Sequence, residues 1–135
     1  MNVPPHADSA GKLILRLTLG GTMLLHGWSK VIGYPESMAG MGKMLAAHGL
    51  PAFVAYGAFV GEVLAPLMVI LGLFTRTGAA LMAVNMVFAI WLAHAKDVFT
   101  LNEHGGWGIE LQAFYLFVAI AICFLGSGRF AVKPS

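Results

Sequence analysis

The stretch PAFVAYGAFVGEVLAPLMVILGLF, residues 51–74, decides the fold of this chain. It is apolar from end to end and contains a single charged side chain, Glu62. About 20 consecutive apolar residues are enough for a helix to cross the hydrocarbon core of a bilayer. The stretch therefore predicts a transmembrane helix that carries one carboxyl group near its middle.

Three other apolar segments accompany this stretch. The last two are apolar around the whole helix circumference, which does not fit a soluble bundle with one wet face. We therefore predict an all-α membrane protein in which a bundle of four transmembrane helices forms a single domain, residues 1–135. The four helices are expected at about residues 11–30, 51–74, 77–95 and 108–126. Turn signals bracket the connection 31–50, in which residues 38–47 predict a short interfacial helix.

The composition of the chain agrees with this prediction. Of 135 residues, 59% are hydrophobic and 10% are charged, against about 25% charged in an average soluble domain. The net charge is +2 and no basic run is present, so we expect no nucleic-acid partner. The single Cys123 excludes a disulfide framework within the chain and a cysteine metal site, and we assign no metal site.

The basic residues predict the topology. An even number of spans places both termini on one side, together with five of the eight Lys and Arg residues. The excess of basic residues favours that side as the cytoplasm, so the chain is expected in the cytoplasmic (inner) membrane, with segment 31–50 facing outward. Within the first span, Arg16 lies deep enough to need either a partner or a side chain that extends to the interface.

Glu62 is the most informative polar position. A charged side chain in the middle of a span costs about 2.5–3.5 kcal/mol on insertion scales, so the carboxyl is expected to be neutral unless a cation or donors lie close. Pro66, four residues later, lacks the N–H that would bond the Glu62 carbonyl. We predict that Glu62 accepts or donates a proton; the alternative is a hydrogen bond that only holds helices together.

Other polar side chains gather in the outer half of the predicted bundle: His26, Lys30, His94 and Glu110. They suit a polar pocket that handles protons; axial haem ligation by two histidines and a metal site remain alternatives. Asn85 lies nine positions before His94, on the opposite face of an ideal helix, and is expected to bond another helix instead of sharing that pocket.

Several motifs together resemble the DoxX family of small four-helix membrane proteins, over about residues 12–130. The C-terminal GSGRF, residues 126–130, is similar to a G-P-G-x-aromatic ending of that family, with Ser127 in place of the proline. The motifs that carry the resemblance are Arg16-Leu-x-x-Gly20, His26-Gly27-x-x-Lys30-x-x-Gly33, Gly49-Leu50-Pro51, Glu62 and Leu71-Gly72-Leu73-Phe74-Thr75-Arg76.

This resemblance implies membrane redox chemistry with quinone. We expect a protein associated with redox metabolism that binds a quinone or small polar ligand around Glu62, His26 and His94. The further ligand-binding residues that we predict are Lys30, Arg76 and Glu110.

Nothing in the sequence supplies an electron carrier, so the chain would act as an oxidoreductase subunit with a partner and not alone. Two alternatives stay open: a non-catalytic assembly or accessory protein for a partner complex, and a small proton-coupled transporter built as a homo-oligomer.

Overall fold

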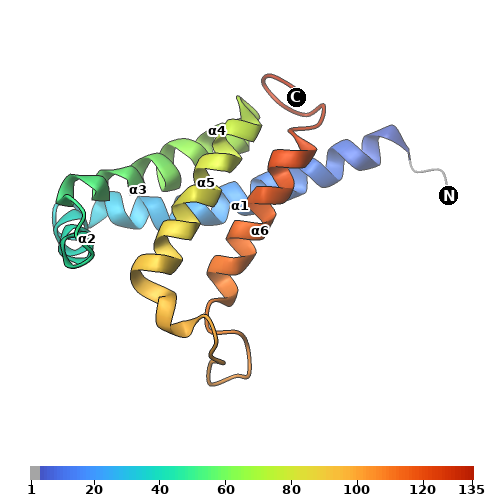
Figure 1. Ribbon diagram of the computed structural model, residues 1–135. Coiled ribbons are helices and arrows are strands. Elements are labelled where there is room, and N and C mark those ends of the chain that lie inside the picture. Colours follow the sequence, from blue (N-terminus) through green and yellow to red (C-terminus); the bar gives the residue numbers. More distant parts are fainter. Residues whose placement is uncertain (1–3) are drawn as a thin grey trace.

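The computed structural model describes residues 4–135, and that part of the chain is helical (Figure 1). It contains no β-strand beyond an isolated bridge between Leu101 and Trp107. The predicted all-α class is therefore confirmed.

The first helix, α1, runs from Pro5 to Ile32, which is longer than the predicted 11–30. Proline suits the first turn of a helix, where its missing N–H has no intrahelical acceptor to bond. The helix ends at Gly33, whose N–H donates to the Ser29 carbonyl over 3.0 Å. A turn then leads into α2, Glu36–Ala47, where the sequence predicted a short helix.

The apolar stretch 51–74 forms one continuous helical run, Ala52–Leu71, whose pitch changes along its length. A π-helical turn ends two residues before Pro66, and a missing N–H is a common cause of such local changes in hydrogen bonding. The successive pieces are η1 (3₁₀, Ala52–Tyr56), α3 (Gly57–Phe59), η2 (π, Val60–Leu64) and α4 (Ala65–Leu71).

A tight turn reverses the chain after α4. Gly72 has a φ of 73°, which glycine adopts without the penalty that a Cβ brings. The Gly72 N–H donates to Val69 and the Leu73 N–H donates to Met68, the two bonds of a Schellman motif. The next helix begins three residues after Gly72.

That next helical run is again of mixed pitch and covers Thr75–Asp97. Its pieces are α5 (Thr75–Ala89), η3 (π, Ile90–His94) and η4 (3₁₀, Ala95–Asp97). A loop then leads to α6, Glu110–Leu125. In Figure 1 this loop lies at the end of α5 and α6 opposite to the C-terminal tail.

The helices pack around one main core. Helix α5 packs on α6 and α4, while α1 packs on α4 and α6. Small residues and methionines fill the centre, and a second cluster of Met38, Leu45 and Ala55 joins α2 to η1. The main core consists of Leu19, Met23, Ala65, Val69, Ala79, Met82, Met86, Ala119 and Ile122.

Two helical runs are long and apolar enough to cross a membrane, Ala52–Leu71 and Thr75–Asp97. Only 39% and 22% of their most apolar stretches are buried, whereas the core helix of a soluble protein buries most of its length. Helix α6 is also apolar, with 16 residues. Their exposed apolar faces fit a bilayer, while the four-span topology and the cytoplasmic side of the termini stay predictions.

Candidate functional site

Glu62 forms an ion pair inside the bundle. Its side chain lies on the π-helical turn η2, the residue is 6% exposed, and its Oε1 is 2.5 Å from Nζ of Lys30 near the end of α1. The sequence expectation of a neutral carboxyl depended on the absence of a nearby cation. The structure supplies that cation, so the two charges compensate each other, with the carboxylate buried and 26% of the Lys30 side chain exposed.

Asn85 on α5 completes this polar cluster. Its Nδ2 donates to Glu62 Oε2 over 3.2 Å, so each carboxylate oxygen has a partner from a different helix. The expectation that Asn85 bonds another helix is confirmed. The cluster Lys30–Glu62–Asn85 joins α1, η2 and α5 at one point.

Two glycines let the helices approach closely enough for this cluster. A Cβ at Gly27 of α1 would overlap the carbonyl oxygen of Glu62, and a Cβ at Gly61 would lie 2.5 Å from Cβ of Asn85. Close backbone contact of this kind is what small residues allow between membrane helices. The glycine of the HGxxK motif therefore positions α1 against the backbone of Glu62.

The polar cluster opens into a cavity of about 650 Å³. Ligand sites typically have volumes of about 300–1,000 Å³ and mostly apolar walls with a few polar groups, and this cavity matches that description. The polar contributors are Lys30, Ser37, Glu62, Asn85 and His94. The apolar walls come from α2, from the run Ala52–Leu71, from α5 and from η3, and include Met41, Met44, Leu45, Val60, Val84, Phe88 and Leu92.

His94 lines the same cavity as Asn85, which corrects the sequence expectation. In an ideal α-helix nine residues place two side chains on opposite faces. The π-helical turn Ile90–His94 has more residues per turn, and it rotates His94 toward the face of Asn85. Two π-helical turns thus contribute polar side chains, Glu62 and His94, to one cavity.

His26 does not line this cavity. Its ring packs edge-on against Tyr115 of α6, with ring centroids 5.7 Å apart. His94 meets the same helix one turn away, where Gln112 Nε2 lies 3.3 Å from His94 Nε2. The structure therefore brings Lys30, Glu62 and His94 together, and places His26 against α6.

Glu110 and Arg76 also lie outside the cavity. Glu110 is the first residue of α6 and lines a second, smaller hollow of about 390 Å³ together with Trp107. Arg76 lies in the first turn of α5, at the opposite end from His94, beside Gly126. Among residues 4–135, no group of three or more His, Cys, Asp or Glu side chains could hold a metal ion.

Arg16 has the partners that the sequence required of it. It is 1% exposed and donates to four backbone carbonyls at 2.7–3.0 Å. Two acceptors, Val69 and Ile70, lie in the last turn of α4, where the helix dipole places partial negative charge. The other two, Ser127 and Phe130, lie in the C-terminal tail.

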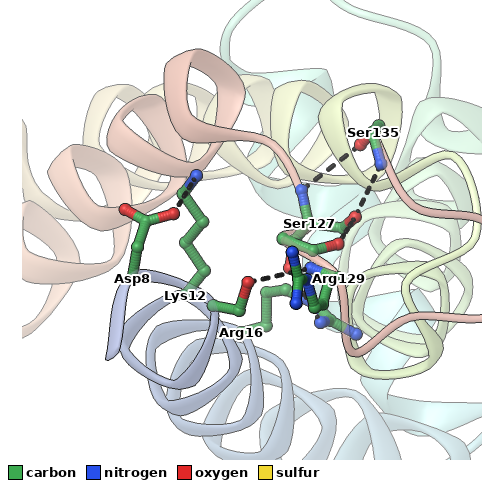
Figure 2. A network of polar contacts seen from close by, with 8 residues as sticks. Asp8, Lys12, Arg16, Ser127, Arg129 and Ser135 are labelled. Atoms are coloured by element: carbon green, nitrogen blue, oxygen red, sulfur yellow. Dashed lines mark hydrogen bonds and ion pairs between the residues drawn. The ribbon is translucent and has the colours of Figure 1, made fainter. Parts of the chain in front are cut away.

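Further hydrogen bonds hold the C-terminal tail in place around Arg16 (Figure 2). The Ser127 N–H and hydroxyl bond to Ser135, and the Arg129 N–H donates to the Ser9 hydroxyl over 3.3 Å. Figure 2 also shows Lys12 paired with Asp8 on α1, over 2.7 Å. Ser127, which stands where the resemblance expected proline, uses its own N–H here, and proline could not do so.

These features define the class of the protein. Its described residues are helical, its long helices expose apolar faces, and a polar cluster lies beside a ligand-sized cavity, as in a small helical membrane protein. The DoxX family model matches residues 11–95, which include Lys30, Glu62, Asn85 and His94. The chain belongs to the DoxX family.

Two relatives cover most of the chain. An "Uncharacterized protein" of Haemophilus influenzae is 31% identical over 87% of this chain and 84% of its own length. The "Putative oxidoreductase CatD" of Bacillus subtilis is 31% identical over 92% of this chain and 85% of its own length. No solved structure matches the chain.

Proposed function

We propose that this protein is a redox-linked, multi-pass protein of the cytoplasmic membrane that binds a quinone in the cavity beside Glu62. The observation that carries the proposal is the Lys30–Glu62–Asn85 cluster, in which Glu62 is buried and its two partners are partly buried, at the wall of an apolar cavity of about 650 Å³. Membership of the DoxX family and the likeness to a protein named as an oxidoreductase support the redox link.

The cluster suits both redox states of a quinone ring. The Lys30 ammonium has three N–H donors and Glu62 accepts one of them, so a quinone carbonyl can accept another. The hydroxyl of a hydroquinone can instead donate to the Glu62 carboxylate. The ring itself fits among apolar side chains such as Phe88 and Leu92.

The cavity rim favours a ligand that arrives from the lipid phase. Four of the side chains that line it are large, apolar and exposed: Met44, Val60, Val84 and Phe88. In a bilayer this opening would face acyl chains, where quinones dissolve. A water-soluble ligand gains nothing from an apolar rim of this kind.

The proposed role of the chain is binding and proton handling. Reduction of a quinone to a hydroquinone takes two electrons and two protons. Glu62 and Lys30 act only on the protons, while the electrons come from a partner subunit or a bound redox cofactor.

Equilibrium binding of 2-methyl-1,4-naphthoquinone to the detergent-purified full chain tests this proposal. Glu62→Gln and Lys30→Met are each expected to weaken binding about 10-fold or more, since a hydrogen bond to a charged group contributes about 1.5–3 kcal/mol. Thr22→Val serves as the control, because Thr22 bonds only carbonyls of its own helix. Unchanged affinity in both site variants would overturn the proposal.

One observation favours a second candidate, an assembly or accessory protein without a ligand. Both oxygens of Glu62 already have partners inside the chain, as a purely structural pair would. Purification from native membranes separates the two candidates. An extracted quinone supports the first, whereas a stoichiometric partner protein with no extractable quinone supports the second.

A further inference from the structure

The cavity has a second polar end at His94. Asn85 and His94 both line it and are nine residues apart, so about two helical turns separate them along the helix axis. The wall between them is apolar and includes Phe88, Ala89 and Leu92. A ligand that fills the cavity can therefore meet hydrogen-bonding groups at two opposite ends.

The contact with Gln112 determines what His94 offers to such a ligand. The side-chain nitrogen Nε2 of Gln112 lies 3.3 Å from His94 Nε2. An amide N–H donates, so Nε2 of His94 accepts and the ring proton lies on Nδ1. The nearest carboxylate oxygen, Oδ2 of Asp97, is 3.8 Å from Nδ1, too far for a hydrogen bond. The Nδ1–H is therefore available to a ligand.

We propose that His94 binds the far end of the ligand through Nδ1–H and that Gln112 is the positioning residue that fixes this tautomer. The inference rests on the proposed function and deepens it, because it specifies a ligand with an acceptor oxygen at each end. A 1,4-quinone has this arrangement. Its first carbonyl meets Lys30 and its second carbonyl meets His94.

Two probes of similar size test this two-ended recognition. The first, 2-methyl-1,4-naphthoquinone, has two opposed carbonyls, and the second, 1-tetralone, is a bicyclic ketone with one. The unchanged protein is expected to bind the quinone roughly 10-fold more tightly, the effect of one further hydrogen bond. His94→Phe is expected to abolish this preference and leave the affinity for 1-tetralone unchanged, which also shows that the variant is folded.

The Gln112 variants test the tautomer. A carboxylate accepts instead of donating, so Gln112→Glu moves the ring proton to Nε2 and is expected to remove the preference for the quinone. The ring ¹⁵N chemical shifts of His94 are expected to exchange their protonated and unprotonated positions in this variant. His104→Phe, in the loop before α6, is the matched control with 86% of its side chain exposed, and it should keep the preference.

The outcomes separate this inference from the proposed function. If Glu62→Gln weakens quinone binding but His94→Phe weakens both probes equally, or neither, the two-ended site is wrong and the proposed function stands. Unchanged ring nitrogen shifts in Gln112→Glu would remove the positioning role of Gln112. If the unchanged protein binds neither probe, the proposed function itself is wrong.

Discussion

Arg16 shows how a buried charge is stabilised without a carboxylate. Its guanidinium has five N–H donors in a rigid plane, and four carbonyls accept from them. Lysine has a single nitrogen and no planar fork, so it cannot reproduce these directions. The residue therefore joins α1, α4 and the C-terminal tail in a way that depends on arginine itself.

Arg16→Lys is expected to lower the free energy of unfolding by about 2–4 kcal/mol, because carbonyls buried in the structure lose a charged donor. Thermal unfolding of the purified protein in detergent measures the loss. Arg129→Lys is the control: that side chain is exposed, and a change within about 0.5 kcal/mol is expected. Equal melting temperatures for the two variants would contradict the role given to Arg16.

The pair of Lys30 and Glu62 allows structure and function to be separated. Lys30→Met alone leaves the buried carboxylate without its cation and is expected to destabilise the fold by about 3–5 kcal/mol. The double variant Lys30→Met with Glu62→Leu removes both charges, and we expect it to recover most of that stability. Melting curves and quinone binding are measured side by side. A stable double variant that still binds quinone would show that the pair is not the ligand site.

At the scale of elements, the π-helical turns are the features that sequence reasoning could not place. Pro66 indicated irregular hydrogen bonding near Glu62, and in the structure η2 ends two residues before it. No proline follows Ile90–His94 within the next helical residues, so η3 left no comparable signal. The effect of η3 is to bring His94 to the face of Asn85, which the ideal helical period excluded.

Gly27→Ala tests the close contact between α1 and η2. The added methyl group would overlap the Glu62 carbonyl, so α1 must move outward and the melting temperature is expected to fall by several degrees or more. Gly21→Ala, on the same helix, is the matched control because nothing lies within 4 Å of its Cβ position. We expect Gly21→Ala to leave the melting temperature unchanged or to raise it, since alanine stabilises a helix by about 1 kcal/mol relative to glycine.

At the scale of the whole molecule, cysteine labelling tests the predicted topology. In a Cys123→Ser background, Glu103→Cys is expected to react with a membrane-impermeant maleimide in intact cells. Lys133→Cys is expected to react only after the membrane is opened, because the excess of basic residues predicts that the tail lies in the cytoplasm. Labelling of Lys133→Cys in intact cells would reverse the predicted orientation.

Sequence predicted the helical class, the helix in segment 38–47 and a lone carboxyl within an apolar helix at Glu62, because hydropathy and a charge within an apolar run are local signals. It could not pair Glu62 with Lys30, because that contact depends on how α1 crosses η2. Gln112 carried no signal, since an amide at a helix entry is commonplace. His26 looked equivalent to His94 by depth along its helix, yet the rotation of α1 places it against Tyr115 instead.

The bonds of Arg16 also impose an order on the maturation of the chain. Its first two acceptors, Val69 and Ile70, leave the ribosome more than 50 residues after it, while Ser127 and Phe130 follow 111 and 114 residues after it. When the first helix is synthesised, none of these four acceptors exists yet. All four acceptors surround the guanidinium only when segment 127–130 packs beside α1, so a late part of the sequence completes the bonding of the first helix.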